Sequence, residues 1–304
     1  IVGGLFAINR GAASMNCVRS TSRFLLLSIF FLISNFILLT AIADESRLKP
    51  FVLAKSNLAG ALDANANSTA KRLTGSGFEV VGQYSPYADT KILVITNNSL
   101  RQHAAQSEFG AYGAILRVTL SKTTDGIQLS YTNPTYMAHV YRMKSDLAAT
   151  GQQLAKLLGR EKEYGSAEGL TKEELRDYQY KWLMPYFTDR HELADYGSQQ
   201  EAITAVEKVL ASRPGGASKV YRVDIPGKQE SVMGISLPGP EENDCSGDSY
   251  IMSRIDFKKI KSAGHLPYEV VIANGKVYSL YAEFRIAINF PDLSMMGSNS
   301  FASI

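Results

Sequence analysis

Residues 114–131 read AILRVTLSKTTDGIQLSY and carry the strongest local signal in the chain. Apolar and polar residues alternate on both sides of Asp125-Gly126, and an Asp-Gly pair favours the tight turn of a β-hairpin. A second stretch has the same pattern, with predicted strands at 268–272 and 277–288 on either side of Asn274-Gly275. Asn-Gly is the preferred pair for a two-residue hairpin turn. The sequence therefore predicts two antiparallel hairpins.

The same order of elements precedes each hairpin. Before the first, the hydrophobic spacing predicts an amphipathic helix, two strands and a short helix, at 56–73, 78–84, 91–96 and 100–107. Before the second, the corresponding elements are predicted at 198–211, 219–225, 231–237 and 250–260. Strands that alternate in this way suit sheets covered on one face.

We therefore predict an α+β fold of two tandem two-layer repeats, at residues 50–160 and 198–304. Each repeat is expected to form an antiparallel four-stranded sheet, and the two repeats to pack as a pseudo-dimer. A longer helix is predicted at 136–158 after the first hairpin. Because no equivalent helix follows the second hairpin, the second repeat is predicted to be truncated at its C-terminus.

The predicted linker, residues 161–197, contains a helix and many aromatic residues. Thr171 and Glu174 have the spacing of a capping box, which predicts a helix that runs to about Met184 and ends before Pro185. The aromatic residues of this segment are Tyr178, Tyr180, Trp182, Tyr186 and Phe187. Such large rings can clamp two repeats together by burying much surface, or they can form a stacking platform for a ligand.

The N-terminal region has the composition of an export signal. Residues 1–14 precede the first Met, Met15, and are interpreted as an upstream or artefactual segment. Residues 15–43 then combine a short basic start, an apolar stretch and Ala41-Ile42-Ala43, which predicts a cleaved signal peptide. The alternative is an uncleaved anchor, because residues 24–42 are just long enough to cross a bilayer.

The charge of the remaining chain argues against nucleic acid as a partner. The whole sequence has 32 basic and 29 acidic residues, and residues 1–43 contain Arg10, Arg19 and Arg23 but no acid. Removal of this leader therefore leaves a net charge of zero, whereas proteins that bind a phosphate backbone carry a basic excess. Cys17 lies in the leader as well, so Cys245 would have no partner for an intramolecular disulfide.

Several phrases resemble a known family. They are YGAILRV at 112–118, SYTNP at 130–134, SKVYRVDIPGK at 218–228, HLPYE at 265–269, and FRIA with FPDL within 284–293. Together they resemble exported bacterial proteins related to the domain-of-unknown-function 302 family. The resemblance implies an α+β fold that pairs into dimers or pseudo-dimers in the cell envelope. It supplies no activity and no catalytic residues.

One group of residues could carry out acid–base chemistry. His265 stands just before a predicted strand that contains Glu269, and a histidine beside a carboxylate can transfer protons near neutral pH. Arg285 and Tyr131 complete this candidate catalytic set. The alternative is structural: Pro267 would fix the backbone, and Glu269 would pair with Arg285 on the facing strand.

Two further sets of residues are candidates for binding. Tyr178, Trp182, Tyr186 and Tyr268 are candidate ligand-binding residues. The loop EENDCSGD at 241–248 supplies clustered carboxylates, so Glu242, Asp244 and Asp248 are candidate ligands for calcium. Because the spacing departs from that of a calcium-binding loop, a solvated loop is the alternative. No cofactor is predicted, and the four histidines lack the spacing of a metal site.

These observations favour an exported, periplasmic protein that is not an enzyme and that binds a small molecule or another envelope protein. The alternative location is the inner membrane, with the uncleaved leader as the only membrane contact. The alternative function is a small-molecule hydrolase whose acid–base site contains His265 and Glu269.

Overall fold

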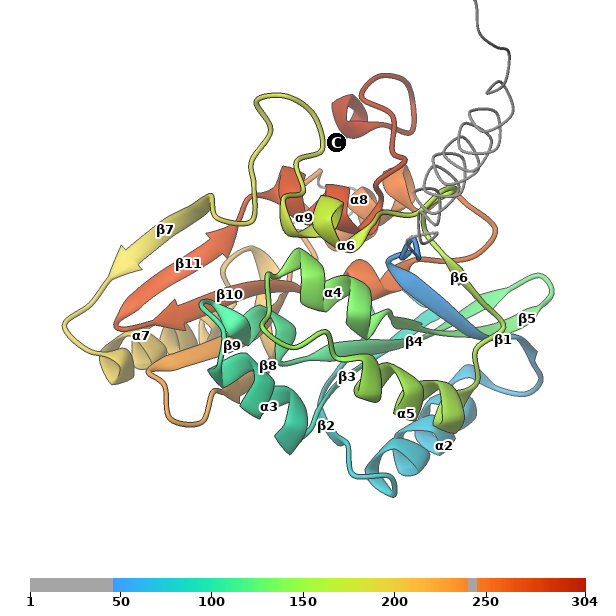
Figure 1. Cartoon of the computed structure of the whole chain (residues 1–304), viewed down its shortest axis with the longest axis horizontal. Helices are drawn as coiled ribbons and strands as arrows, with labels where there is room; N and C mark the ends of the chain where they lie inside the picture. The colour runs from blue at the N-terminus through green and yellow to red at the C-terminus, as the bar shows by residue number, and fades with distance from the viewer. Residues whose placement is uncertain (1–45, 240–244) are drawn as a thin grey trace, which may run out of the picture. The chain divides into compact units, whose positions relative to one another are not determined.

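The computed structural model describes residues 46–239 and 245–304, and Arg47–Ile304 form one unit with two antiparallel sheets (Figure 1). The predicted upstream segment and signal peptide, and the candidate metal ligands Glu242 and Asp244, lie outside the described residues. Among the residues that are described, no helix has both the length and the hydropathy that a membrane span requires. The α+β class predicted from the sequence is confirmed.

The first sheet contains six strands in the order β2-β3-β4-β5-β1-β6. The strands are β1 (Phe51–Leu58), β2 (Glu79–Tyr84), β3 (Thr90–Thr96), β4 (Leu116–Thr123), β5 (Gly126–Thr132) and β6 (Lys162–Tyr164). The predicted hairpin is β4–β5, in which Val118 pairs with Tyr131. The sheet has more strands than the four predicted, because β1 and β6 join its far side. The helix predicted from residue 56 overlaps the end of β1, since a short apolar run does not distinguish a strand from a helix.

The second sheet contains five strands in the order β7-β11-β10-β9-β8. They are β7 (Arg190–Asp195), β8 (Ser218–Asp224), β9 (Glu230–Ser236), β10 (Tyr268–Ala273) and β11 (Lys276–Leu280). Asn274 and Gly275 form the predicted turn between β10 and β11, with φ angles of 52° and 87° that Asn and Gly tolerate best. The fifth strand, β7, comes from the segment predicted as a linker.

Helices cover these sheets in Figure 1. They are α2 (Leu62–Thr74), α3 (Asn98–Ala105), α4 (Pro134–Val140), α5 (Ala148–Leu158), α6 (Lys172–Arg176), α7 (Gln199–Ala211), α8 (Asp248–Ile255) and α9 (Ala282–Asn289). The helix predicted at 136–158 is divided into α4 and α5. The predicted capping box of Thr171 and Glu174 is present, but α6 ends at Arg176 rather than near Met184. Beyond it the chain turns so that both Tyr178 and Phe187 enter the core.

The prediction of a strand at 277–288 is wrong in its second half. β11 ends at Leu280, and the next residues form α9. Every residue from Phe284 to Asn289 is buried. From Phe284 onward the helix is buried on every side, and its apolar residues Phe284, Ile286 and Ile288 alternate as in a strand, so the pattern does not distinguish a helix from a strand.

Each sheet, with its helices, forms one half of the unit, and each half contributes a 3-10 turn that contacts the sheet of the other half. The 3-10 turn Gly110–Gly113 contacts β9 and β10 of the second sheet, and the 3-10 turn Ala263–His265 contacts β3, β4 and β5 of the first. β2 also lies beside β8, where a Cβ atom at Gly82 would come within 2.8 Å of the Val220 carbonyl oxygen. One hydrophobic cluster therefore contains buried side chains from both sheets.

Aromatic rings of the predicted linker take part in this packing. The Phe187 ring lies 5.9 Å from Tyr112, 5.6 Å from Tyr141 and 6.1 Å from Phe284. Phe187 thus contacts rings from both halves, as the clamp interpretation predicts.

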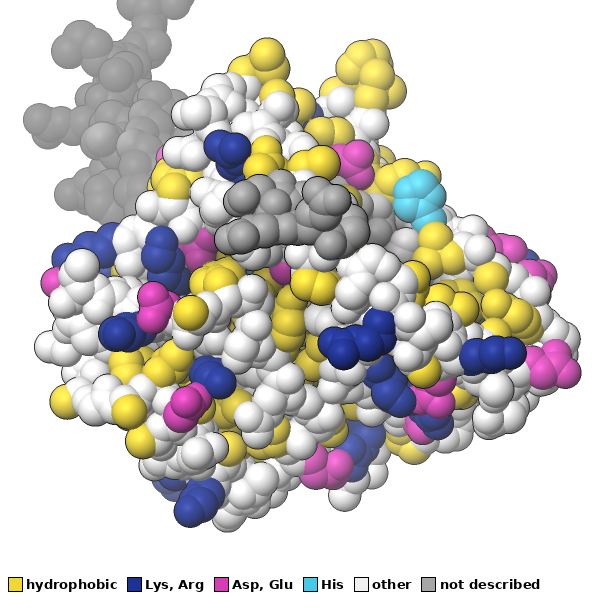
Figure 2. Space-filling view, turned by 180° about the vertical axis from the view of Figure 1, so that it is seen from behind, with side chains coloured by type: hydrophobic (Ala, Val, Ile, Leu, Met, Phe, Trp, Pro, Cys, Tyr) yellow, Lys and Arg dark blue, Asp and Glu magenta, His cyan; other side chains and the backbone are white. Residues whose placement is uncertain are grey.

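Some large hydrophobic side chains remain exposed. Within the described residues they are Trp182, Leu183, Leu193, Val209, Phe257, Met295 and Met296. Trp182 and Leu183 lie between α6 and β7, and the two methionines follow α9. Figure 2 shows hydrophobic side chains that project at two separate points of one end of the unit.

Candidate functional site

A buried ion cluster joins the two sheets. Glu269 of β10 forms ion pairs with Arg117 of β4 and with Arg285 of α9, and all three side chains are almost completely buried. The predicted Glu269–Arg285 pair is therefore confirmed, although Arg285 lies on a helix rather than on the facing strand. Arg117 was not among the predicted site residues. We refer to these three residues as the Glu269 cluster.

Backbone carbonyls complete the environment of the two guanidinium groups. Arg285 donates hydrogen bonds to the carbonyl oxygens of His265 and Pro267, the latter at 3.2 Å, and Arg117 donates to Pro267 at 3.4 Å. The Arg285 guanidinium also lies 4.6 Å from the centre of the Tyr268 ring. Two cations and one anion share this buried space, so the carbonyl dipoles offset part of the excess positive charge.

His265 lies next to this cluster but in an apolar setting. It is completely buried, and its ring has edge contacts with Tyr268 and Phe290, with centroids 5.4 and 5.6 Å away. Burial, and next the nearby Arg285 charge, hold the pKa of His265 well below its usual value. Neither ring nitrogen has a hydrogen-bond partner among the described residues. His265 is therefore a neutral core side chain at physiological pH.

The candidate catalytic residues are only partly brought together. Tyr131 lies apart from the Glu269 cluster, where its hydroxyl donates to the Gly159 carbonyl at 3.3 Å and burial raises its pKa to about 12. None of Tyr131, His265, Glu269 and Arg285 lines either of the two pockets described below.

The structure separates the candidate ligand-binding residues. Tyr178 is buried, and its hydroxyl donates to the Ala287 carbonyl at 3.2 Å. Tyr268 is half-buried and packs against Arg285 and His265. Trp182 points into solvent, and Tyr186 lies at the side of an open cleft. These four rings do not form one stacking platform.

Asp248, the described member of the candidate metal set, is part of the core. It begins α8, is fully buried, and accepts hydrogen bonds from the Tyr84 hydroxyl and from the Leu237 amide at 2.8 Å. Burial raises its pKa to about 6. In the part of the chain that the structure describes, His, Cys, Asp and Glu residues form no group of three that could hold a metal ion.

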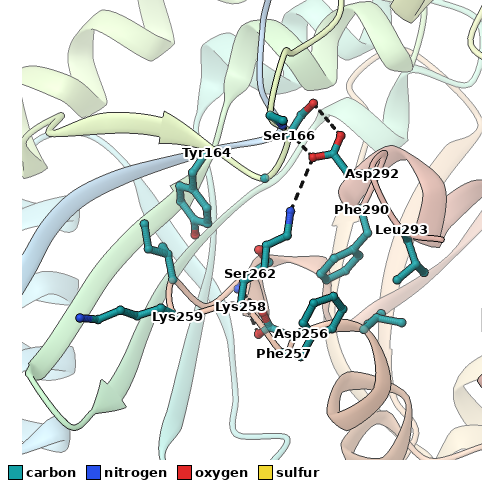
Figure 3. Close-up of a pocket in the computed structure, with 14 residues that line it drawn as sticks. Tyr164, Ser166, Asp256, Phe257, Lys258, Lys259, Ser262, Phe290, Asp292 and Leu293 are labelled. Carbon is teal, nitrogen blue, oxygen red and sulfur yellow. Dashed lines mark hydrogen bonds and ion pairs between the residues drawn. The ribbon is translucent and has the colours of Figure 1, made fainter. Parts of the chain in front are cut away.

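A pocket of about 310 Å³ lies where three distant segments meet (Figure 3). The segments are 164–167 after β6, 255–262 after α8, and 290–293 after α9. Its lining is mainly apolar: Tyr164, Ala167, Ile255, Phe257, Ile260, Phe290 and Leu293. Figure 3 shows Phe257 and Phe290 on one side and Tyr164 on the other, whereas Lys259 points away. We call this space the apolar pocket.

A few polar groups hold the walls of the apolar pocket. Asp292 accepts hydrogen bonds from Ser166 Oγ at 3.0 Å and from the Ala167 amide at 2.7 Å, and it pairs with Lys258 at 3.5 Å. Asp256 is buried beneath the loop and accepts from the Ser262 amide at 2.9 Å. Burial raises the pKa of Asp256 to about 6.

A wider cleft of about 930 Å³ adjoins the apolar pocket at Asp292. It shares Asp292, Leu293 and the 166–167 segment with the apolar pocket, and three tyrosines of the predicted linker line it: Tyr178, Tyr180 and Tyr186. Paired charges lie at its edge, including Arg47 and Glu174 at 3.1 Å. We call this space the tyrosine cleft.

The residues of the apolar pocket could not be identified as a site from the sequence. Asp256, Lys258 and Asp292 belong to no spaced motif, and the segments that carry Tyr164 and Asp292 lie more than a hundred residues apart. The one available signal was the apolar pair Phe257 and Ile260 within the charged stretch DFKKI at 256–260.

Comparisons of the chain with protein-family models, with curated proteins and with solved structures find no match. The resemblance to the domain-of-unknown-function 302 family therefore stays a prediction.

Proposed function

We propose that this chain is an exported, non-enzymatic protein of the cell envelope that binds a small, mainly apolar molecule in the apolar pocket. The observation that carries the proposal is a pocket of about 310 Å³ whose surface is supplied mainly by seven apolar residues, with six polar or charged residues among them. Pockets that hold small ligands have volumes from about 300 Å³ upward and have this mixed lining.

The lining indicates the class of ligand. The rings of Tyr164, Phe257 and Phe290 offer apolar surface, and burial of such surface contributes about 25 cal/mol per Å². The charged groups near the pocket are already engaged, since Asp292 pairs with Lys258 and Asp256 accepts from the Ser262 amide. A neutral molecule with an apolar body and one hydrogen-bonding group fits these properties best.

The burial of His265 argues against the alternative function, a hydrolase with His265 as its general base. A general base needs to reach the proton that it removes, either directly or through one water molecule. His265 is completely buried between Tyr268 and Phe290, and both carboxylate oxygens of Glu269 face guanidinium groups. We therefore assign the Glu269 cluster a structural role.

We also propose that the two halves are tandem repeats that pack as a pseudo-dimer. Apart from short 3-10 turns, the order β1-α2-β2-β3-α3-β4-β5-α4 has a counterpart in β7-α7-β8-β9-α8-β10-β11-α9. The strand order β2-β3-β4-β5-β1 likewise has a counterpart in β8-β9-β10-β11-β7. The reciprocal contacts of the turns Gly110–Gly113 and Ala263–His265 also support a pseudo-two-fold relation. The apolar pocket then lies between the second repeat and the segment 164–167, which extends from β6 at the edge of the first sheet.

Titration of the full chain with the neutral dye 1-aminoanthracene tests the proposed binding. We expect its fluorescence to rise on binding, and decanol to displace it better than decanoate or decylamine. In Ile260→Trp, a ring at the pocket wall fills the space, so dye affinity should fall at least about tenfold. Val209→Trp adds the same ring on an exposed face of α7 and should leave affinity unchanged.

A second variant that fills the pocket keeps the test valid if Ile260→Trp does not fold. Ala167 lies at the exposed side of the pocket, so Ala167→Trp blocks it without replacing a core side chain. If both variants keep the circular dichroism of the wild type and also bind dye normally, the apolar pocket is not the binding site.

A further inference from the structure

Two projecting segments of the unit meet at one end. One is residues 178–188 between α6 and β7, and the other is residues 293–304 after α9 (Figure 1). The Tyr180 ring lies 4.7 Å from Phe301, and the Tyr180 hydroxyl donates to the Leu293 carbonyl. These contacts hold the two segments together. The outer residues of one segment therefore keep their position relative to those of the other. We call these outer residues, Trp182 with Leu183 and Met295 with Met296, the two tips.

The tips carry an unusual amount of exposed apolar surface. Trp182 is 84% exposed, Leu183 77% and Met296 75%. Four of the seven large hydrophobic side chains that remain exposed in the described residues belong to the tips. Concentrated exposed apolar surface of this kind marks a site of interaction.

The charges of the two segments restrict what that partner can be. Residues 178–188 contain one charged side chain, Lys181, and residues 293–304 contain none, although 20% of the whole chain is charged. The carboxylates that flank the two segments are engaged: Asp177 pairs with Arg142 at 3.2 Å, Asp189 accepts from the Tyr186 amide at 2.8 Å, and Asp292 pairs with Lys258 at 3.5 Å. A surface without carboxylates can approach lipid without the cost of dehydrating an anion.

We propose that the two tips insert into the surface of a lipid bilayer. Tryptophan prefers the interface between lipid and water, where its ring is buried and its N–H stays hydrated. Leu183 and the two methionines can enter the upper acyl region, and Lys181 can extend back to lipid phosphates. A protein partner would need a contiguous, complementary patch, whereas here the open tyrosine cleft lies between the segments. A bilayer deforms around separate tips and requires no such fit.

The chain contains its own reporter for this proposal, because Trp182 is its single tryptophan. The full chain is mixed with vesicles of phosphatidylcholine and phosphatidylglycerol whose acyl chains are either plain or brominated. We expect Trp182 emission to shift to shorter wavelength with plain vesicles and to be quenched by the brominated ones. Quenching reports the depth of Trp182 itself, so it remains informative if the N-terminal region also binds the vesicles.

Matched variants locate the contact. Leu183→Asp and Met296→Asp each place a carboxylate at one tip, and the double variant places one at both. Each variant should weaken the quenching, and the affinity of the tips for vesicles should fall at least about tenfold. Val209→Asp changes an exposed apolar residue on α7, away from the tips, and should have no effect. The proposal is overturned if Trp182 of vesicle-bound protein is not quenched, or if Val209→Asp weakens quenching as much as the tip variants do. It is also overturned if emission shifts without vesicles as the protein forms dimers, because the tips then bind a second copy.

Discussion

The Glu269 carboxylate and the Arg117 guanidinium form a buried ion pair that connects the second sheet to the first. Arg285 binds the same carboxylate from α9, so one anion holds two cations. Removal of the anion should cost more than removal of one cation, because it leaves two buried guanidiniums without a counter-charge.

Glu269→Gln should therefore lower the free energy of unfolding by about 3–5 kcal/mol. Arg117→Met should cost less, because Arg285 still neutralises Glu269. Urea unfolding followed by circular dichroism measures both values. A loss for Glu269→Gln no larger than that for Arg117→Met would contradict a structural role for the shared carboxylate.

His265 should make the protein less stable in mild acid. Its pKa in the folded state is lowered by burial, whereas in the unfolded chain it takes up a proton near pH 6.5. Its contribution to stability is thus present above pH 6.5 and is lost as pH falls, by about 1.4 kcal/mol per pH unit at most. The stability of wild type relative to His265→Phe should decrease between pH 7 and pH 5. An unchanged difference would indicate that His265 is solvated.

Asp256 should have the opposite pH dependence. Burial raises its pKa to about 6 from the usual 3.8, so the folded state binds a proton more tightly than the unfolded state does. Its contribution is present below pH 4 and is lost as pH rises through 6, by at most about 3 kcal/mol. Unfolding of wild type and Asp256→Asn at pH 4 and pH 7 measures this change. The expectation fails if the wild type does not lose stability relative to the variant as pH rises.

The hydrogen bonds of Asp292 should control the wall of the apolar pocket. Asp292→Ala removes the acceptor for Ser166 and Ala167, so it should cost about 1 kcal/mol and weaken 1-aminoanthracene binding several-fold. Lys258→Gln removes only the ion pair to Asp292, which contributes about 0–1 kcal/mol when exposed, so its effect on dye affinity should be smaller. If both variants weaken dye binding equally, the ion pair between Asp292 and Lys258 holds the pocket wall, and the hydrogen bonds of Asp292 do not.

The parts of the fold that local sequence determines were predicted well. The turn at Asn274-Gly275 needs residues that tolerate positive φ, and the cap at Thr171 needs a hydroxyl and a glutamate at fixed spacing. The strand predicted through Phe284 was wrong because α9 is buried on every side from Phe284 to Asn289, and its apolar residues there alternate as in a strand.

The candidate site could be predicted only where its residues are close in sequence. Glu269 and Arg285 were expected to pair, but Arg117 reaches the same carboxylate only because β4 and β10 come together in the folded protein. The apolar pocket likewise combines Tyr164, Phe257 and Phe290 from three segments, which no local pattern relates. His265 was a catalytic candidate because its burial cannot be deduced from its neighbours in the sequence.

The central claim is that a small apolar ligand binds in the apolar pocket. TROSY spectra of the ¹⁵N-labelled full chain, recorded during titration with decanol, locate the ligand directly. We expect the largest amide shifts at Tyr164, Ile260 and Leu293, which line the apolar pocket. Saturable shifts centred on His265 and Glu269 instead, with those three amides unchanged, would contradict the account.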